Sequence, residues 1–180
     1  MDTKKRPIII DTDPGIDDAV ALAIALNHPN LEVRLITTVA GNVDVEKTTN
    51  NALKLVDFFG KKVPVAKGCN CPLLIQLEDS AEIHGETGMD GFEFPQPIST
   101  CLDIHAVEAM RKEILSSDVP LTIVPIAALT NIALLLTLYP EVKENIAEIV
   151  MMGGSLARGN TNTSAEFNTY VDPHAAQIVF

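Results

Sequence analysis

The chain has 180 residues, of which 47% are hydrophobic and 21% charged, a composition that favours one packed globular domain over a disordered chain. Its formal net charge of -11 would repel nucleic acid and anionic membrane surfaces, so we expect neither as a partner. The apolar runs are also far shorter than the roughly 20 residues that a membrane-spanning helix needs.

Cysteine usage and the start of the chain both indicate a cytoplasmic protein. Cys69, Cys71 and Cys101 are an odd number, which argues against a disulfide framework, and no second Cys or His pair stands near them at the spacing of a metal site. The basic start, residues 1–7, precedes an apolar stretch that is too short for a signal peptide because it meets Asp11 at once.

Short β-rich runs alternate with helical patterns along the whole chain. Strands are predicted over residues 7–10, 33–40, 63–66, 121–127 and 148–154, and helices over residues 17–27, 45–60, 104–117, 129–140 and 172–180. Helices of this length between strands serve as crossovers in a parallel sheet that is covered on both faces. The sequence therefore predicts a single α/β domain over residues 1–180, with an open, mostly parallel, Rossmann-like sheet.

Four aspartates follow the first predicted strand, in the stretch "DTDPGIDD". Asp13 suits the N-cap of the following helix and Pro14 its first position, while Asp17 and Asp18 fall in the first turn, where the helix dipole favours negative charge. Capping gives no reason for Asp11 or for two adjacent acids. Clustered carboxylates at the end of a buried strand therefore indicate a bound cation.

Polar or glycine-rich segments follow the other long strands too. Because ligands bind at the carboxyl ends of the strands in open parallel sheets, we expect these segments to converge on the aspartates; they contain Asn42, Asn131, Asn160, Glu166 and Asn168. Their oxygen atoms suit Ca²⁺ or Mg²⁺ better than Zn²⁺. The aperiodic segment 68–100, which contains "HGETGMDG", is long enough to be a functional loop such as a lid.

Six motifs in this order resemble the inosine-uridine-preferring nucleoside hydrolases: "DTDPGIDDA", "ITTVAGN", "IHGETGMDG", "VPIAALTNIA", "EIVMMGG" and "GNTNTSAEFNTYVDPHAAQIVF". The resemblance runs from Ile8 to Phe180. It implies an open α/β sheet and the hydrolysis of the N-glycosidic bond of ribonucleosides with a tightly bound Ca²⁺. The bond breaks through a ribosyl oxocarbenium ion, which nearby carboxylates stabilise.

The resemblance also implies a role for each matching residue. Asp13 would bind the metal and act as general base on its bound water, while Asp18 and the backbone carbonyl of Ile126 would be further metal ligands. His84 would be the second catalytic residue, near the nucleobase, and Asp11 would orient its neighbours from behind the site. The remaining positions would bind the ribose: Asp17 at the diol, Asn42, Asn160, Glu166 and Asn168 at the hydroxyls, and Met152 and Phe167 around the sugar.

The resemblance covers only part of the family pattern. Family members are longer and carry a further His-Asp pair in their carboxyl-terminal part, whereas this chain stops at Phe180 inside a predicted helix. We therefore expect a domain that is incomplete at its C-terminus, either a fragment or a truncated protein, with weak metal binding and little turnover if nothing follows. An exposed apolar face would promote association, and we expect a homo-oligomer.

Substrate preference and two alternative functions remain open at this point. The chain has no Trp for stacking on purines, and Tyr170 and Phe167 are the aromatic residues near the site motifs, so we expect a pyrimidine-preferring or broad specificity. One alternative is an inactive nucleoside- and metal-binding relic. The other is a Mg²⁺-dependent phosphohydrolase, because "IIIDTD" also resembles the start of the haloacid-dehalogenase-like phosphatases, with Asp11 as nucleophile and Asp13 as acid/base. Pro14 departs from that second pattern.

Overall fold

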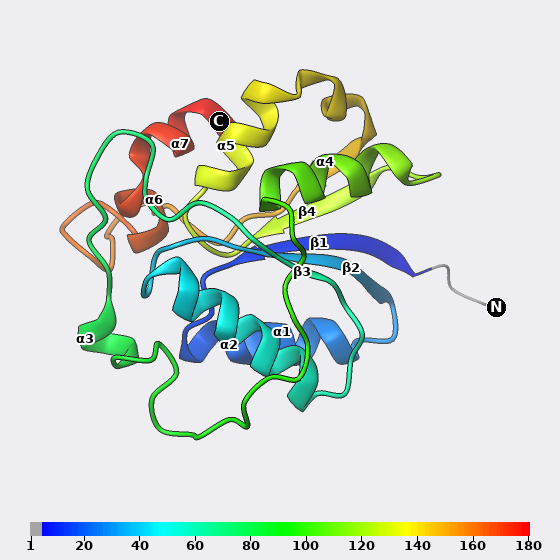
Figure 1. Cartoon of the computed structure of the whole chain (residues 1–180). Helices are drawn as coiled ribbons and strands as arrows, with labels where there is room; N and C mark the ends of the chain where they lie inside the picture. The colour runs from blue at the N-terminus through cyan, green and yellow to red at the C-terminus, as the bar shows by residue number, and fades with distance from the viewer. Residues whose placement is uncertain (1–4) are drawn as a thin grey trace.

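The computed structural model describes residues 5–180, so most of the basic start of the chain lies outside the described residues. Five strands form one sheet with the order β3-β2-β1-β4-β5, and each neighbouring pair is parallel (Figure 1). The strands are β1 (Arg6–Thr12), β2 (Leu31–Thr38), β3 (Val65–Lys67), β4 (Leu121–Pro125) and β5 (Ile146–Ile149). The predicted open parallel α/β sheet is confirmed.

Helices cover both faces of this sheet. They are α1 (Ile16–Asn27), α2 (Val45–Phe58), α3 (Ala81–His84), α4 (Ala106–Ser116), α5 (Thr130–Leu138), α6 (Phe167–Val171) and α7 (Pro173–Val179), with a 3-10 helix over Pro140–Asn145. Helices α1 and α2 lie on one side of the sheet, and α4, α5 and α7 lie on the other (Figure 1). Among the described residues, no helix is long and apolar enough to cross a membrane.

The alternation of side chains along the strands builds two cores. Ile8 and Ile10 of β1 pack with Leu22 of α1 and Leu55 of α2, whereas Ile9 belongs to the core formed with α4 and α5. Successive side chains of a strand point to opposite faces, so an unbroken apolar run marks a strand that is buried on both sides. The three consecutive isoleucines of β1, Ile8 to Ile10, form such a run, and β1 is the central strand of the sheet.

The start of α1 differs from the prediction. The helix begins at Ile16 with Gly15 as its N-cap, so the assignment of Asp13 as N-cap and Pro14 as first helical residue is wrong. The carboxylate of Asp13 instead accepts a hydrogen bond from the backbone N–H of Asn42, at 2.7 Å. Asp18, at the third helical position, accepts from the N–H of Gly15 at 3.0 Å, which is half of a capping box.

The order of the strands places the site. The chain adds β2 and β3 on one side of β1, and then β4 and β5 on the other. In such sheets, two neighbouring strands have connections that leave toward opposite faces of the sheet. The crevice between these connections, at the carboxyl ends of the strands, is the usual ligand-binding site. Here these strands are β1, which ends just before Asp13, and β4, which ends just before Ile126.

Candidate active site

A cavity of about 480 Å³ lies at the carboxyl ends of the strands. It is lined by all of the predicted site residues except Asp11: Asp13, Asp17, Asp18, Asn42, His84, Ile126, Met152, Asn160, Glu166, Phe167 and Asn168. The cavity is also lined by Asp79, Ser80, Glu82, Ile83 and Thr161, which the sequence did not single out. The fold therefore brings the predicted set together from segments that are far apart in the chain.

Asp13 and Asp18 are buried carboxylates held by short-range contacts. Asp13 is 1% exposed, and its Oδ1 is buried without a hydrogen-bond partner among the described residues. Asp18 is 5% exposed. Its Oδ1 accepts from the hydroxyl of Thr12 at 2.7 Å, and its Oδ2 accepts from Gly15 N–H and from the amide of Asn42. One oxygen of Asp13 is thus left to bind a cation, a water molecule or a proton.

Asp11 lies behind the cavity and is fully buried. Its Oδ1 accepts hydrogen bonds from Thr37 Oγ1 and from Asn131 Nδ2, and its Oδ2 is buried without a partner in the described part of the chain. Asn131, which was predicted to converge on the aspartates, reaches only this one. A carboxylate with no access to the cavity has no route to a substrate, so this burial opposes Asp11 as a phosphatase nucleophile.

Burial makes the charged forms of these carboxyls costly. It raises the pKa of Asp11 to about 7, against the lowering effect of the hydrogen bonds from Thr37 and Asn131. It also raises the pKa of Asp13, and the negative charge of Asp18 raises it further. Burial likewise raises the pKa of Asp18. A cation beside these groups would lower their pKa values by stabilising the charged forms.

The donor set fits a hard cation that has other ligands as well. The unpartnered Asp13 Oδ1 is the observation that supports such a site, and Asp18 and Ile126 line the same cavity. No three His, Cys, Asp or Glu side chains within residues 5–180 gather closely enough to hold a metal by themselves. A cation here would therefore also need backbone oxygen, such as the carbonyl of Ile126, and oxygen atoms of water or substrate.

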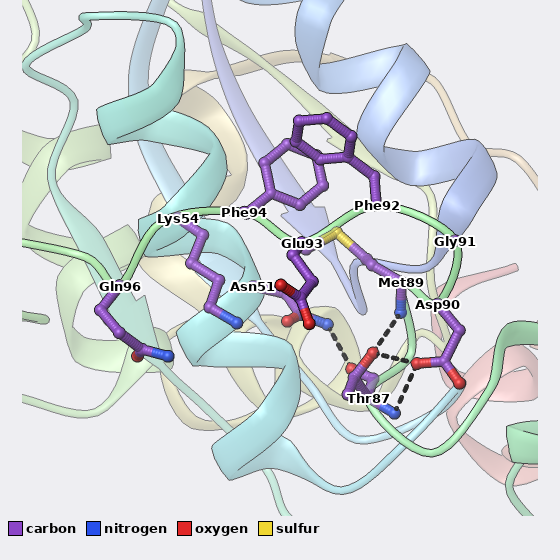
Figure 2. Close-up of a pocket in the computed structure, with 10 residues that line it drawn as sticks. All are labelled: Asn51, Lys54, Thr87, Met89, Asp90, Gly91, Phe92, Glu93, Phe94 and Gln96. Atoms are coloured by element: carbon purple, nitrogen blue, oxygen red, sulfur yellow. Dashed lines mark hydrogen bonds between the residues drawn. The ribbon is translucent and has the colours of Figure 1, made fainter.

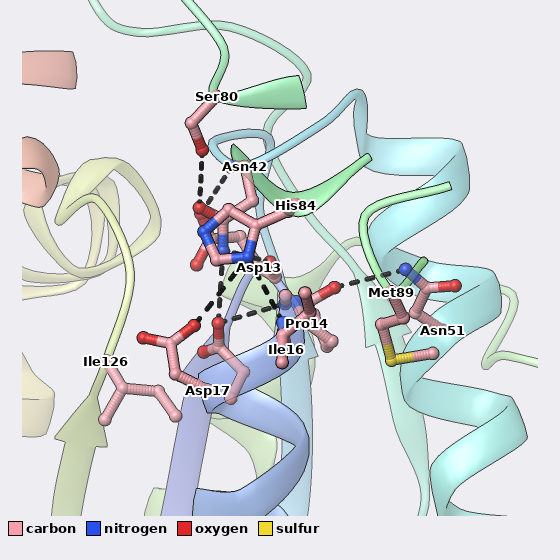
Figure 3. Close-up of polar contacts among 12 residues, drawn as sticks. Asp13, Pro14, Ile16, Asp17, Asn42, Asn51, Ser80, His84, Met89 and Ile126 are labelled. Carbon is pink, nitrogen blue, oxygen red and sulfur yellow. Dashed lines mark hydrogen bonds and ion pairs between the residues drawn. The ribbon is translucent and has the colours of Figure 1, made fainter. Parts of the chain in front are cut away.

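Asn42 connects the aspartates to the long loop. Its Nδ2 donates to the carbonyl of Asp13 at 3.0 Å and to Asp18 Oδ2 at 3.1 Å, while its Oδ1 accepts from the hydroxyl of Ser80 at 2.9 Å (Figure 3). Because an amide NH₂ has only two hydrogens, both of its donors are used within the protein. Only the remaining acceptor capacity of Oδ1 is left for a sugar hydroxyl.

His84 ends α3, a four-residue helix that lies inside the segment predicted as a functional loop. Its Nδ1 accepts a hydrogen bond from the N–H of Ile16 at 3.2 Å and lies 3.9 Å from a carboxylate oxygen of Asp17 (Figure 3). An imidazole nitrogen that accepts carries no proton, so in the neutral ring the proton is on Nε2. Gly15 permits this approach, because a Cβ there would lie 2.7 Å from His84 Nδ1.

The far wall of the cavity comes from the segment around α6. Asn168 donates through Nδ2 to the carbonyls of Ile126 and Met152, each at 3.1 Å, which fixes this amide across the ends of β4 and β5. Glu166 caps α6, and its carboxylate accepts from the N–H groups of Asn168, Thr169 and Gly154. Asn160 Oδ1 accepts from Phe167 N–H at 2.8 Å, so its Nδ2 is the group available to a ligand.

Comparison with known proteins identifies the family. The model of the inosine-uridine preferring nucleoside hydrolase family matches residues 8–180. The chain belongs to this family. A non-specific ribonucleoside hydrolase, RihC, from Klebsiella pneumoniae (strain 342) is 53% identical over 176 residues, which are 98% of this chain and 58% of that protein. RihC from Salmonella typhimurium is also 53% identical, over 99% of this chain and 58% of the relative.

Solved structures of family members have the same fold. The purine-preferring ribonucleoside hydrolase from Gardnerella vaginalis superposes with a TM-score of 0.92 at 36% identity, and covers 97% of this chain and 57% of its own. The plant nucleoside hydrolase PpNRh1 gives a TM-score of 0.88 at 35% identity, with 97% and 56% covered. The chain thus spans less than three fifths of the length of these nucleoside hydrolases, and the predicted family resemblance is confirmed over the part that matches.

Proposed function

We propose that this protein hydrolyses the N-glycosidic bond of ribonucleosides to ribose and free base. The observation that carries the proposal is the arrangement of the cavity, in which the unpartnered carboxylate oxygen of Asp13 shares one hollow with His84 and with the amides of the far wall. Membership in the nucleoside hydrolase family supports it.

Asp13 is proposed as the general base. Asn42 N–H holds its Oδ2 at 2.7 Å, which leaves Oδ1 to take a proton from a water molecule that attacks the anomeric carbon. Burial and the charge of Asp18 raise the pKa of Asp13 when no cation is bound, and a cation beside it would lower this pKa and keep the carboxylate ionised, which is the form that accepts a proton. The carboxylates also stabilise the positive charge that develops on the ribosyl ring.

His84 is proposed to assist the departure of the base. Since its Nδ1 accepts from Ile16 N–H, Nε2 is the protonated nitrogen of the neutral ring and donates a hydrogen bond to the leaving nucleobase. Such a bond lowers the energy of the negative charge that the base acquires as the glycosidic bond breaks. The exposed carboxylate of Asp17, together with Asn160 Nδ2 and Asn168 Oδ1, is proposed to hold the ribose hydroxyls.

Calcium is proposed as the metal, with Asp13, Asp18 and the Ile126 carbonyl as protein ligands. All three are hard oxygen donors, which Ca²⁺ prefers. When bound, the ion would supply positive charge that orients sugar hydroxyls and makes water more acidic. Asp11 accepts a hydrogen bond from Asn131 and lies behind the cavity. It is proposed to fix the carboxyl end of β1, and with it the position of Asp13.

Broad specificity is the proposal for the nucleobase. The relatives at 53% identity are described as non-specific, whereas the purine-preferring structure is 36% identical. Phe167 and Ile83 are apolar residues in the lining and suit a planar base without selecting purine or pyrimidine by hydrogen bonds. A homo-oligomer, a cytoplasmic location and a single domain remain predictions.

Release of reducing sugar from inosine and uridine tests the proposal, with EDTA and then with added Ca²⁺. We expect ribose release that depends on Ca²⁺ and is lost in Asp13→Asn. Glu32→Gln is the control, because Glu32 is an exposed residue near the opposite, amino end of β2. Nucleoside binding without release would support the alternative of an inactive binding protein, and release from both substrates in the Asp13→Asn variant would refute the role of Asp13.

A further inference from the structure

Asn51 of α2 does not line the cavity, yet it joins two segments that do. Its side chain is buried, with an exposed fraction of 2%. Nδ2 donates one hydrogen bond to the carbonyl of Pro14, at 3.1 Å, and one to the carbonyl of Thr87, at 2.8 Å (Figures 2 and 3). Both hydrogens of this amide are therefore used to connect chain segments.

The two carbonyls belong to the turn that carries Asp13 and to the segment that carries His84, and these two residues must be held in a fixed relative position. Pro14 follows Asp13 directly, in the turn that precedes α1. Thr87 comes three residues after His84, and both Thr87 and Asn51 line a second cavity, of about 660 Å³, between α2 and the stretch that follows Thr87 (Figure 2). Asn51 thus lies between the aspartate turn and the histidine segment.

Hydrogen bonds hold α3 in place, whereas the buried side chain of Met89 anchors the end of the histidine segment in the core beside α2. None of the four residues of α3 is buried. The segment is attached through Ser80 to Asn42, through His84 to Ile16 N–H and through Thr87 to Asn51. The bond from Ile16 is the longest of these three, at 3.2 Å, and the bond from Asn51 is the shortest, at 2.8 Å. Beyond His84, the segment is thus attached by Met89 in the core and by the hydrogen bond from Asn51 to Thr87, and Asn51 is the residue that also binds the Pro14 turn.

We propose that Asn51 is a positioning residue for the reaction, which fixes His84 relative to Asp13 by holding the Thr87 carbonyl to the Pro14 turn. It touches neither substrate nor metal. Removal of its amide leaves the carbonyls of Pro14 and Thr87 without this donor and loosens the segment from Ile83 to Asp90, which the core contact of Met89 still attaches beside α2. The catalytic part of this inference rests on the proposed function, whereas the structural part does not.

Gly88 offers an independent way to disturb the same contact. A Cβ at Gly88 would lie 3.1 Å from Asn51 Nδ2 and 3.0 Å from a methyl group of Val43. Its φ of 84° is also in the region that residues with a Cβ rarely adopt. Gly88→Ala should therefore weaken the contact between Asn51 and the histidine segment without changing any residue of α2.

Hydrogen exchange of the full chain tests the structural part. In Asn51→Ala we expect exchange of the amides of Ile83–Asp90 to be faster by about tenfold, the effect of losing one to two buried hydrogen bonds, with the amides of β1 unchanged. Gly88→Ala should give the same pattern and decides the case if Asn51→Ala does not fold. Asn50→Ala is the matched control, because Asn50 is the neighbouring residue on α2. Unchanged exchange in both variants, or equal acceleration in the control, would overturn the proposal.

Kinetics with two leaving groups test the catalytic part. Nitrophenolate leaves without a proton, so 4-nitrophenyl riboside has little need of His84, whereas the bases of inosine and uridine need it. We expect Asn51→Ala to lower kcat for the nucleosides by about tenfold with little change in KM, and to lower kcat for the nitrophenyl riboside by less than about twofold. An equal loss on both substrates would indicate a general structural role and overturn the catalytic part. No turnover by the unmodified protein would refute the proposed function, and exchange would still decide the role of Asn51.

Discussion

Replacement of Asp11 by Asn should change how the stability of the protein depends on pH. Asp11 is fully buried, and its carboxyl has a pKa of about 7 in the folded chain against an ordinary value of 3.8. A raised pKa means that the folded state binds the proton more tightly than the unfolded state does. The stability from this group is thus fully present below pH 3.8 and is lost as the pH rises through about 7.

The magnitude follows from the size of this shift. A difference of about three pKa units, at about 1.4 kcal/mol for each unit, corresponds to about 4 kcal/mol of unfolding free energy lost between acid and neutral pH. Asn cannot ionise, so the variant lacks this loss. The NH₂ group of Asn takes the place of Oδ2, which has no partner among the described residues. Burying this NH₂ group without an acceptor costs about 1–3 kcal/mol of unfolding free energy, and this cost is the same at every pH.

Denaturant unfolding in EDTA at about pH 5 and pH 8 measures the effect, because a bound cation would lower the pKa. The quantity compared is the unfolding free energy of Asp11→Asn minus that of the parent chain. We expect this quantity to be about 2–3 kcal/mol more positive at pH 8 than at pH 5. Asp57→Asn is the control. Hydrogen bonds from Ser99 lower the pKa of this exposed carboxyl, so Asp57 stays ionised between about pH 5 and pH 8. The difference in unfolding free energy between Asp57→Asn and the parent chain should therefore be the same at both pH values. A difference for Asp11→Asn that is equal at both values would refute the reasoning.

Four further substitutions, one of them a control, test the packing of the site and core. Gly15→Ala should lower kcat/KM for inosine by about tenfold or more, because its Cβ would lie 2.7 Å from His84 Nδ1; unchanged kinetics would contradict the close approach. Asp172→Ala should lower the unfolding free energy by about 2–4 kcal/mol in a denaturant titration, since this buried carboxylate accepts three hydrogen bonds from the long loop, α5 and its own helix α7. Leu135→Ala should cost about 2–5 kcal/mol in the same assay, whereas Leu138→Ala, at a residue 59% exposed, should cost less than about 0.5 kcal/mol.

The sequence predicted the main elements of the fold because their patterns are local. Apolar runs such as Ile8–Ile10 and helical patterns of roughly ten residues identify the five strands and the five longer helices, but the bounds of the last strand were wrong: it was predicted over residues 148–154 and is Ile146–Ile149, because the apolar run continues into the loop after it. The short helices α3 and α6 were not predicted. Helices of four or five residues have little intrinsic stability, and α6 depends on the capping carboxylate of Glu166.

The predicted site residues were brought together, but their connections could not be read from the sequence. Asp13 has a residue type and position that suit a helix N-cap, and only the tertiary hydrogen bond from Asn42 shows that it serves another purpose. Ser80 and Asn51 had no visible signal. The partners of Asn51 are backbone carbonyls, which any residue type supplies, so no motif could reveal this contact.

The arrangement of the sheet also determines when the site can form during synthesis. The central strand β1 pairs with β4, with Ile8 opposite Thr122, and the cavity needs residues from Asp13 to Asn168. Contacts between segments so far apart in sequence are slow to form because a long loop must close first. A nascent chain therefore carries its aspartates uncovered on the ribosome until almost all of these 180 residues have emerged. During that time the acidic turn after β1 has no cavity around it, and the proposed binding of a nucleoside can begin only when the segment up to Asn168 has docked.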